Sequence, residues 1–451
     1  MPVHVMDFKI YMGDFASPAI REIFEEKSVI NDWLLFEVTL AEMQAELGMI
    51  PKEAAKEIKA KGNLEHIKLD RIAELYRQTM LSSTSMIRAF KEVCENDAGE
   101  FIHYGATSQD LFDTTLALRL KKSMDIFEEG LSTIRSNLNH LADVHRNTIM
   151  AGRTHSQQAL PITFGYKAAI WSDMISKHID RFQEARKRIL VGNISGAMGN
   201  FASFFMIGGQ KCLEMQKMVL ERLGLQTPII SIQPQIERLT EFMNMLSILS
   251  VTFEKIADEI FLLQRNEIGE LEEPFNTKSQ ISSSTMPQKR NPNRCELIKA
   301  VCKKIRSNAF AFSDLYVRDE RDHSPFYLED LIIPETCILV STMLCAAKFV
   351  LGKLVVKKDV MKKNLEITNG LIMTEALMIA LARKTGKKEK AFALIHKVAM
   401  EAFEKGFPFN EYLFEYNEIH NHFSDEEIKN LLKPENYLGL NNLLIERIIQ
   451  S

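Results

Sequence analysis

The chain has 451 residues and a net charge of −4, with hydrophobic and charged fractions of 46% and 26%. That composition is typical of a soluble globular protein of two or three domains, and it gives no global reason to expect nucleic-acid or membrane binding. Only 20 glycines and 13 prolines are present, so turn residues are scarce and long helices are favoured.

The cysteines and the chain's first residues indicate its compartment. The six cysteines form no CxxC pair, and most lie in apolar helical patterns. We therefore expect reduced thiols in a cytoplasmic protein, with neither a disulfide framework nor a metal site. The N-terminal stretch lacks the basic start and apolar core of a signal peptide. The most apolar run, 337–356, contains two hydroxyls and two lysines, so we interpret it as a buried bundle helix and not as a membrane span.

Helical periodicity dominates the chain. The first hundred residues show short helical patterns, including 27–47 and 69–93. Five long helices are then predicted, and short helices with glycine or proline stops follow residue 355. The long helices are expected over 110–146, 161–190, 236–270, from just after Pro292 to about 316, and 327–354. We predict an all-α protein with an N-terminal helical domain (1–108), a central long-helix bundle carrying the catalytic loops (109–355) and a small C-terminal helical domain (356–451).

Three polar stretches interrupt the helices, and the first is HYGATSQD at 103–110. Thr107 and Asp110 resemble a capping box with Asp in place of Glu, which is a purely structural explanation. A helix N-terminus with hydroxyls and free N–H groups is also a suitable site for a carboxylate. Both interpretations stay open from the residues alone.

The second stretch is GRTHSQQALP at 152–161, expected just before a helix that starts at Pro161. His155 has hydrogen-bonding side chains on both sides. A lone histidine is more often structural than catalytic, but an imidazole suits proton transfer because its unperturbed pKa is about 6.5. The pattern makes His155 a candidate acid or base.

The third stretch, NTKSQISSSTMPQKRNPNRCE, begins at Asn276. Its hydroxyl end is typical of a solvated loop. Lys289, Arg290 and Asn291 then precede a helix expected to start at Pro292, which would group cations, an amide and free N–H groups. Such a set would stabilise an anion with two or more charged oxygens. No phosphate-binding or dinucleotide glycine motif accompanies it, so no cofactor is expected.

The residues SSSTMPQKRNP at 282–292 resemble the GSSxMPxKxNP signature of the fumarase/aspartase superfamily, with Ser282 in place of glycine. HYGATSQD and GRTHSQ resemble that family's other two conserved regions, in the same order, so the resemblance covers nearly the whole chain. It implies a homotetramer with a twenty-helix core, in which each active site combines regions of three subunits.

The resemblance also implies roles for individual residues. Ser283 would be the general base, His155 the acid that protonates the leaving group, and Glu296 the partner of that histidine. Lys289 and Asn291 would hold the substrate carboxylate and its aci-carboxylate intermediate. The other implied substrate contacts are Thr107, Ser108, Thr154, Gln235, Met286 and Arg321.

The branch of the family is less clearly marked. The motifs KRNP, ERD and VGNISGAMG resemble adenylosuccinate lyases, whereas HYGATSQD and SPFYLED resemble 3-carboxy-cis,cis-muconate cycloisomerases. Asp14-Phe15, Thr84-Ser85-Met86 and Asp330 replace residues, mostly cationic, that the first branch uses for a nucleotide. Losing cations and gaining acids disfavours a phosphate.

These features predict a lyase that performs β-elimination on a substituted succinate and releases fumarate. The leading substrate class is an N-substituted aspartate that is not a nucleotide, so the partner is a small di- or tricarboxylate. A cycloisomerase reaction is the alternative, adenylosuccinate lyase the third option, and a non-catalytic structural homologue the fourth.

Overall fold

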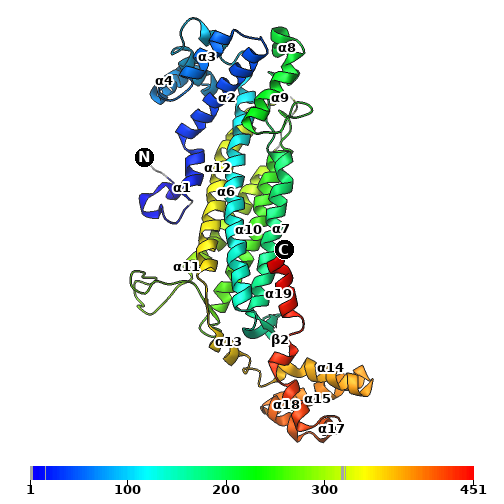
Figure 1. Ribbon diagram of the computed structural model, residues 1–451. Coiled ribbons are helices and arrows are strands. Elements are labelled where there is room, and N and C mark those ends of the chain that lie inside the picture. The colour runs from blue at the N-terminus through cyan, green and yellow to red at the C-terminus, as the bar shows by residue number, and fades with distance from the viewer. Residues whose placement is uncertain (1–3, 16, 316–318, 320) are drawn as a thin grey trace. The chain divides into compact units, whose positions relative to one another are not determined.

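The computed structural model describes residues 4–15, 17–315, 319 and 321–451. Within those residues the chain forms nineteen α-helices, six 3-10 helices and four short strands (Figure 1). The all-α prediction is therefore confirmed.

Five long helices carry most of the middle of the chain. Their bounds are α6 Ser108–Val144, α7 Phe164–Ile189, α10 Glu237–Leu263, α11 Asn293–Ser313 and α12 Ser324–Gly352. All five were predicted, but α10 ends earlier than expected and α7 begins three residues after Pro161. The helical period finds each helix, whereas its ends depend on tertiary contacts.

Shorter helices precede and follow them. The first part of the chain contains α1 Pro18–Phe24, α2 Glu26–Glu46, α3 Lys52–Lys61, α4 Leu69–Thr79 and α5 Ser82–Lys91. Met80, with a φ of 54°, separates α4 from α5, so the expected continuous pattern over 69–93 is two helices. The helices α8 and α9 span Ala202–Gly208 and Lys211–Leu223. The 3-10 helices are η1 Val5–Asp7, η2 Lys9–Tyr11, η3 Ala98–Phe101, η4 Leu371–Met373, η5 Leu413–Glu415 and η6 Pro434–Tyr437.

The C-terminal stretch forms its own apolar cluster. Leu377, Val398, Phe409 and Ile428 are each at most 1% exposed within it, which fixes the short helices against one another. Those helices are α14 Thr374–Thr385, α15 Lys388–Lys405, α16 Phe409–Tyr412, α17 Asn417–His420 and α18 Asp425–Leu431. The same stretch also contains α13 Lys358–Asn364 and α19 Asn441–Gln450.

The strands make two small antiparallel pairs. One is the hairpin of β1 (Ile149–Thr154) and β2 (Gln157–Thr163), and the other joins β3 (Leu271–Glu272) to β4 (Val355–Val356). Pro161, expected as the first residue of a helix, lies inside β2. Its ring sets a φ that also suits an extended chain.

The chain forms two compact units, and each is assembled from three separate stretches. Unit 1 comprises Met1–Gly130, His178–Val251 and Ala300–Cys345, and unit 2 comprises Leu131–Lys177, Thr252–Lys299 and Ala346–Ser451. The boundaries therefore fall within the long helices. In unit 1, Phe127 on α6 packs edge-on against Phe182 on α7, with ring centroids 6.3 Å apart. The division at residues 108 and 355 stays a prediction.

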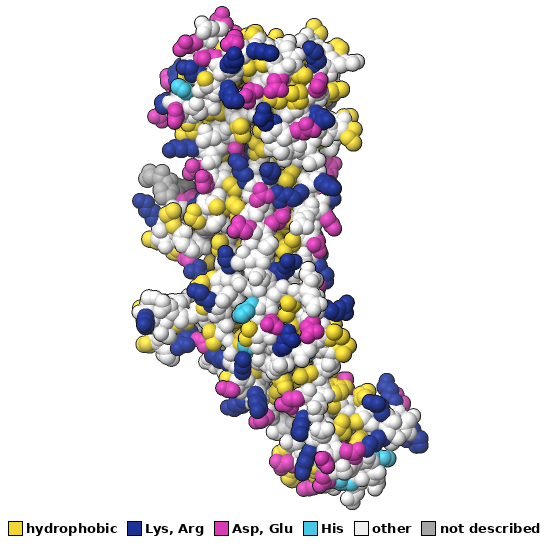
Figure 2. All heavy atoms as spheres, in the orientation of Figure 1, with side chains coloured by type: hydrophobic (Ala, Val, Ile, Leu, Met, Phe, Trp, Pro, Cys, Tyr) yellow, Lys and Arg dark blue, Asp and Glu magenta, His cyan; other side chains and the backbone are white. Residues whose placement is uncertain are grey.

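The helix α12 is long and apolar enough to cross a membrane by composition, and it is the one such helix in the described part of the chain. Its most apolar stretch is 67% buried inside the protein, as in the core helix of a soluble protein. On the face drawn in Figure 2, cationic and anionic side chains are interspersed.

Candidate active site

The start of α6 holds the first polar stretch. The buried Asp110 carboxylate accepts a hydrogen bond from the backbone N–H of Thr107, at 3.0 Å. It also accepts the N–H groups of Ser195 and Gly196, at 2.9 and 3.0 Å. Burial raises the pKa of Asp110, and these N–H groups act against the rise. One of the two hydrogen bonds of the expected capping box is therefore present, from the Thr107 N–H to the Asp110 side chain. The same carboxylate also fixes the loop at Ser195 and Gly196 to the start of α6.

Thr107 and Ser108 are half-buried and line a pocket together with Arg321. The Ser108 hydroxyl lies 2.7 Å from that of Ser83, a fully buried residue on α5. Three residues that the family resemblance implies as substrate contacts therefore share one pocket, although 213 positions separate Ser108 from Arg321 along the sequence.

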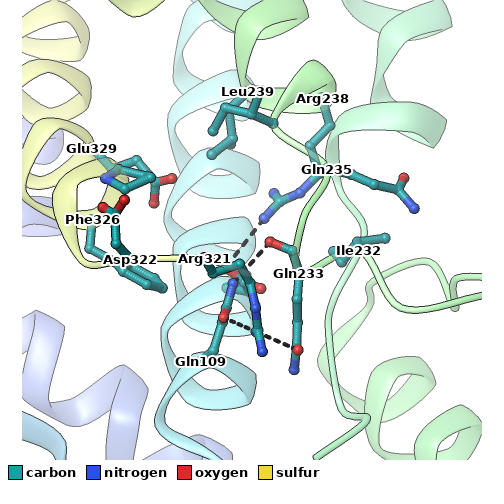
Figure 3. A pocket seen from close by; sticks show the side chains of 13 residues that line it. Gln109, Ile232, Gln233, Gln235, Arg238, Leu239, Arg321, Asp322, Phe326 and Glu329 are labelled. Carbon is teal, nitrogen blue, oxygen red and sulfur yellow. Dashed lines mark hydrogen bonds and ion pairs between the residues drawn. The ribbon is translucent and has the colours of Figure 1, made fainter. Parts of the chain in front are cut away.

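Oxygen atoms from three segments of the chain hold Arg321, and Figure 3 shows the two glutamines among these partners. Its guanidinium donates to the side-chain oxygens of Gln109 and Gln233 and, at 2.6 Å, to the carbonyl of Ala197. The Gln233 amide in turn donates to the Gly196 carbonyl, at 2.8 Å. These contacts fix the guanidinium without giving it a carboxylate partner among the described residues.

The structure identifies Gln233 as a residue that sequence reasoning missed. Gln235, the predicted contact, lines a second cavity that Gln233 and Arg321 also border, but it is exposed, and its amide donates to the Ser231 carbonyl at 3.0 Å. Gln233 is 6% exposed and contacts Arg321 directly. The repeated glutamine of QPQIER was the available signal, but it does not say which glutamine turns inward.

Buried charges lie beside this cluster. Arg238 and Asp113 are 3.8 Å apart, and each is less than a tenth exposed. Burial raises the pKa of Asp113 to about 6. Burial, with the nearby Asp113 carboxylate, raises the pKa of Glu329 to about 8. At neutral pH Glu329 is therefore mostly protonated, which reduces the negative charge near Arg321.

The second polar stretch forms the tip of the β1–β2 hairpin and not a helix start, which corrects the expectation. His155 and Ser156 have φ values of 51° and 63°, which is the backbone of a two-residue hairpin turn. Thr154, His155 and Ser156 are exposed. The tip therefore presents the His155 ring to solvent, with no hydrogen bond to it within the described ranges.

An ion pair anchors this hairpin. Arg153 donates two hydrogen bonds to the fully buried Glu270, at 2.9 and 2.6 Å. The Asn364 amide donates to the same carboxylate at 2.8 Å. Glu270, itself bonded to Asn364, thus fixes the end of β1 that precedes His155.

The third polar stretch closes on itself through Ser282. The Ser282 hydroxyl donates to the Lys289 carbonyl at 2.5 Å and accepts the Asn291 N–H at 3.1 Å. The Asn291 amide donates to the Ser282 carbonyl at 2.7 Å. The Ser283 hydroxyl accepts the Met286 N–H at 3.0 Å. The loop thus places Ser283, Lys289 and Asn291 close along one short turn.

The two cations of this loop have different roles. Arg290 pairs with Glu272 at 2.7 Å, whereas the exposed Lys289 ammonium has no ion pair with any residue that the structure describes. Both line an open cavity with Met286 and Asn291. Of these two cations, only Arg290 is therefore in an ion pair among the described residues.

The N–H groups at the start of α11 are not free, contrary to expectation. The buried Glu273 carboxylate accepts the N–H groups of Arg294 (3.1 Å) and Cys295 (2.6 Å). Burial raises the pKa of Glu273, and these N–H groups oppose the rise. Because a protein carboxylate already occupies this helix end, a substrate anion must rely on the side chains.

A family model described as Lyase matches residues 13–307, and one described as Adenylosuccinate lyase C-terminus matches residues 370–448. The chain belongs to the fumarase/aspartase superfamily. It is a lyase of that superfamily, as its motifs predicted.

Two relatives and one solved structure illustrate where this superfamily member lies. It is 39% identical to adenylosuccinate lyase of Methanocaldococcus jannaschii, over 100% of this chain and 96% of the relative. It is 38% identical to N-acetyl-S-(2-succino)cysteine lyase of Enterococcus italicus, over 98% and 95%. The structure of 3-carboxy-cis,cis-muconate lactonizing enzyme from Pseudomonas putida is 30% identical over 98% of both chains, with a TM-score of 0.89.

Three residues that the superfamily resemblance marks for proton transfer do not meet in this chain. No hydrogen bond joins His155, Ser283 and Glu296 within the described residues, and the Glu296 side chain is exposed on the first turn of α11. In the same residues, no group of three or more His, Cys, Asp or Glu side chains is placed to hold a metal ion. The roles of these three residues stay predictions.

Proposed function

We propose that the chain catalyses β-elimination on a substituted succinate, releasing fumarate and a leaving group that is not a nucleotide. An N-substituted aspartate is the leading substrate class. In the reaction the Cβ–H and Cα–N bonds break, a double bond forms between Cα and Cβ, and the leaving nitrogen gains a proton.

The observation that carries this proposal is the pocket shared by Thr107, Ser108 and Arg321. Two hydroxyls and a guanidinium held by Gln109 and Gln233 are suitable donors to a carboxylate. Because protein oxygens already orient Arg321, the substrate does not have to order it, which reduces the entropy lost on binding.

Ser283 is the proposed base and His155 the proposed acid. The Met286 N–H that donates to the Ser283 oxygen at 3.0 Å supports this role, because such a donor stabilises the alkoxide. The unpaired Lys289 and the Asn291 amide are proposed to stabilise the aci-carboxylate intermediate. Glu296 is proposed to orient and charge His155.

We further propose a homotetramer whose active sites combine residues of several subunits. Two observations support it: His155, Ser283 and Glu296 make no mutual hydrogen bond in the described chain, and the long helices expose apolar side chains. Val251, Phe310 and Leu331 are 55%, 76% and 71% exposed, which favours burial against another copy.

The leaving group is proposed not to be a nucleotide because the replaced positions offer it no cation. Ser85 and Met86 are fully buried on α5, and the Ser85 hydroxyl donates to the Leu81 carbonyl at 2.8 Å. Asp330 is exposed. A phosphate would therefore meet an acid where it needs a cation.

Each alternative substrate has an observation behind it. The relative named N-acetyl-S-(2-succino)cysteine lyase favours a thioether of succinate, and the one named adenylosuccinate lyase favours that nucleotide. The lactonizing enzyme's fold favours a cycloisomerase.

A substrate panel followed by ultraviolet absorbance distinguishes these alternatives. It contains N- and S-substituted succinates, adenylosuccinate and 3-carboxy-cis,cis-muconate. We expect fumarate from a non-nucleotide adduct, and turnover of adenylosuccinate or the muconate alone would contradict the proposal.

Mixing two inactive variants tests the shared sites. If His155 and Ser283 of one site come from different subunits, mixed His155→Ala and Ser283→Ala proteins form some sites with neither change. We expect the mixture, after exchange of subunits, to regain activity that neither parent has. A mixture without activity would place both residues in one subunit. If the single variants stay fully active, other residues carry out the proton transfers. If the unmodified protein has no activity on any of these substrates, it is the non-catalytic homologue.

A further inference from the structure

The Arg321 pocket has an apolar part as well as a polar one. The polar side holds Thr107, Ser108 and Gln109 beside Arg321. The remaining lining residues are mostly apolar or aromatic: Leu81, Phe112, Ala197, His323 and Phe326, with Asp322 as the one acid among the described residues. The open pocket has a cavity volume of about 280 Å³, close to the lower end of the usual range for small-molecule sites.

The aromatic portion of this apolar part is built from two elements. Phe112 on α6 and Phe326 on α12 pack edge to face, with centroids 5.7 Å apart. Phe112 also packs against Trp33, at 5.3 Å, and His323 lies 5.9 Å from Phe326. These contacts fix the two phenylalanines, yet both stay half-buried and line the pocket.

The charge of the pocket is nearly balanced. Arg321 is the one Lys or Arg in the described lining, which also contains a single acid, Asp322. One substrate carboxylate uses Arg321 and the other is assigned to Lys289, so an anionic group on the leaving group would find no further counter-charge in this lining and would lose its hydration. A neutral, apolar body would instead displace water from partly exposed rings, which is favourable.

We infer that Leu81, Phe112 and Phe326 form the leaving-group wall of the site and select an uncharged amine or thiol with an apolar or aromatic body. This inference rests on the proposed function and specifies its substrate class. The three side chains determine specificity and transfer no proton, so their effect lies in KM more than in kcat.

The test compares two leaving groups of similar shape in the full-length protein. The probes are 2-(benzylthio)succinate and 2-(4-sulfobenzylthio)succinate, together with the corresponding N-benzyl aspartates, and the readout is fumarate absorbance. We expect kcat/KM for the neutral member to exceed that for the sulfonate by at least ~10-fold, because the sulfonate would bring one negative charge into the pocket without a cationic partner. Equal efficiency, or a preference for the sulfonate, overturns the inference and leaves the proposed function standing. Fumarate from none of these and from no other succinate adduct overturns both.

A pair of variants tests whether the wall residues determine the preference for a neutral leaving group. Phe326→Ala should raise KM for the benzyl substrate by ~10-fold with kcat changed little, because roughly half a phenyl ring loses its apolar contact. Phe392→Ala, which removes an exposed ring from α15, is the matched control and should leave both constants unchanged. A Phe326→Ala enzyme that discriminates as the wild type does contradicts the inference. If that variant does not fold, Leu81→Ala gives the same comparison at the other end of the wall.

Discussion

The Arg321 pocket and the loop at 276–292 both carry candidate substrate contacts, but they organise them differently. In the pocket, Arg321, Gln109 and Gln233 are bonded to one another, and the buried Asp110 holds the backbone around them. In the loop, Lys289 and Met286 are exposed, and Ser282 is joined by hydrogen bonds to Lys289 and Asn291 within the same short turn. The pocket is thus stabilised by buried polar groups, whereas the loop is stabilised by a short local turn.

Removing the proposed base should give the largest effect and leave the pocket intact. Ser283→Ala should lower kcat by at least ~10²-fold, because positioned proton transfer is typically worth that much. The melting temperature should not change, since Ser283 is bonded only within its own loop. Ser284→Ala, at the exposed neighbouring hydroxyl, is the control. Unchanged turnover in Ser283→Ala would remove the assignment.

Changing Asp110, which holds the backbone around the Arg321 pocket, should instead lower the stability of the fold. Asp110→Asn puts an NH₂ group among three N–H donors, so we expect about 2–4 kcal/mol less stability in urea unfolding. Asp173→Asn, at an exposed i,i+4 pair with Lys177, should change stability by less than about 0.5 kcal/mol. Similar losses in both variants would show that Asp110 does not hold the pocket.

The buried acid Glu329, close to the Arg321 pocket, predicts how the folding stability depends on pH. The pKa of Glu329 is about 8 in the folded protein and about 4.3 when unfolded, so the folded state binds the extra proton. Its contribution is complete below pH ~4.3 and is lost as pH rises towards 8. Glu329→Gln should therefore flatten the fall in stability between pH 5 and 8, by up to about 1.4 kcal/mol per pH unit. An identical slope in the variant would contradict a raised pKa.

The smallest effect is expected at the helix that follows the loop. Glu273→Gln removes the charge that caps α11 and turns an NH₂ group towards one of two N–H donors, so we expect a loss of about 1–2 kcal/mol. Glu267→Gln, on an exposed residue, is the matched control in the same unfolding assay. If Glu273→Gln also lowers kcat well beyond its effect on stability, the cap contributes to positioning Lys289 and Asn291.

The long helices were predictable because their apolar period is local, but several contacts of the site were not. The β1–β2 hairpin was missed because Pro161 suits both a strand and a helix start, and because a histidine in a left-handed turn carries no clear signal. Gln233 and Gln235 flank one proline, and only the contact with Arg321 distinguishes them. The cap of α11 comes from Glu273, twenty residues before that helix begins, where rules based on neighbouring residues do not reach.

The discontinuous make-up of the two units limits how such an enzyme can change. Each unit takes three separate stretches, and the boundaries fall inside continuous helices. Neither unit can therefore be expressed alone as one fragment, nor exchanged between genes by a single recombination event. We therefore expect new substrates to be acquired by point substitutions within this framework. The proposed wall residues Leu81, Phe112 and Phe326 are the positions where we expect one codon to alter selectivity.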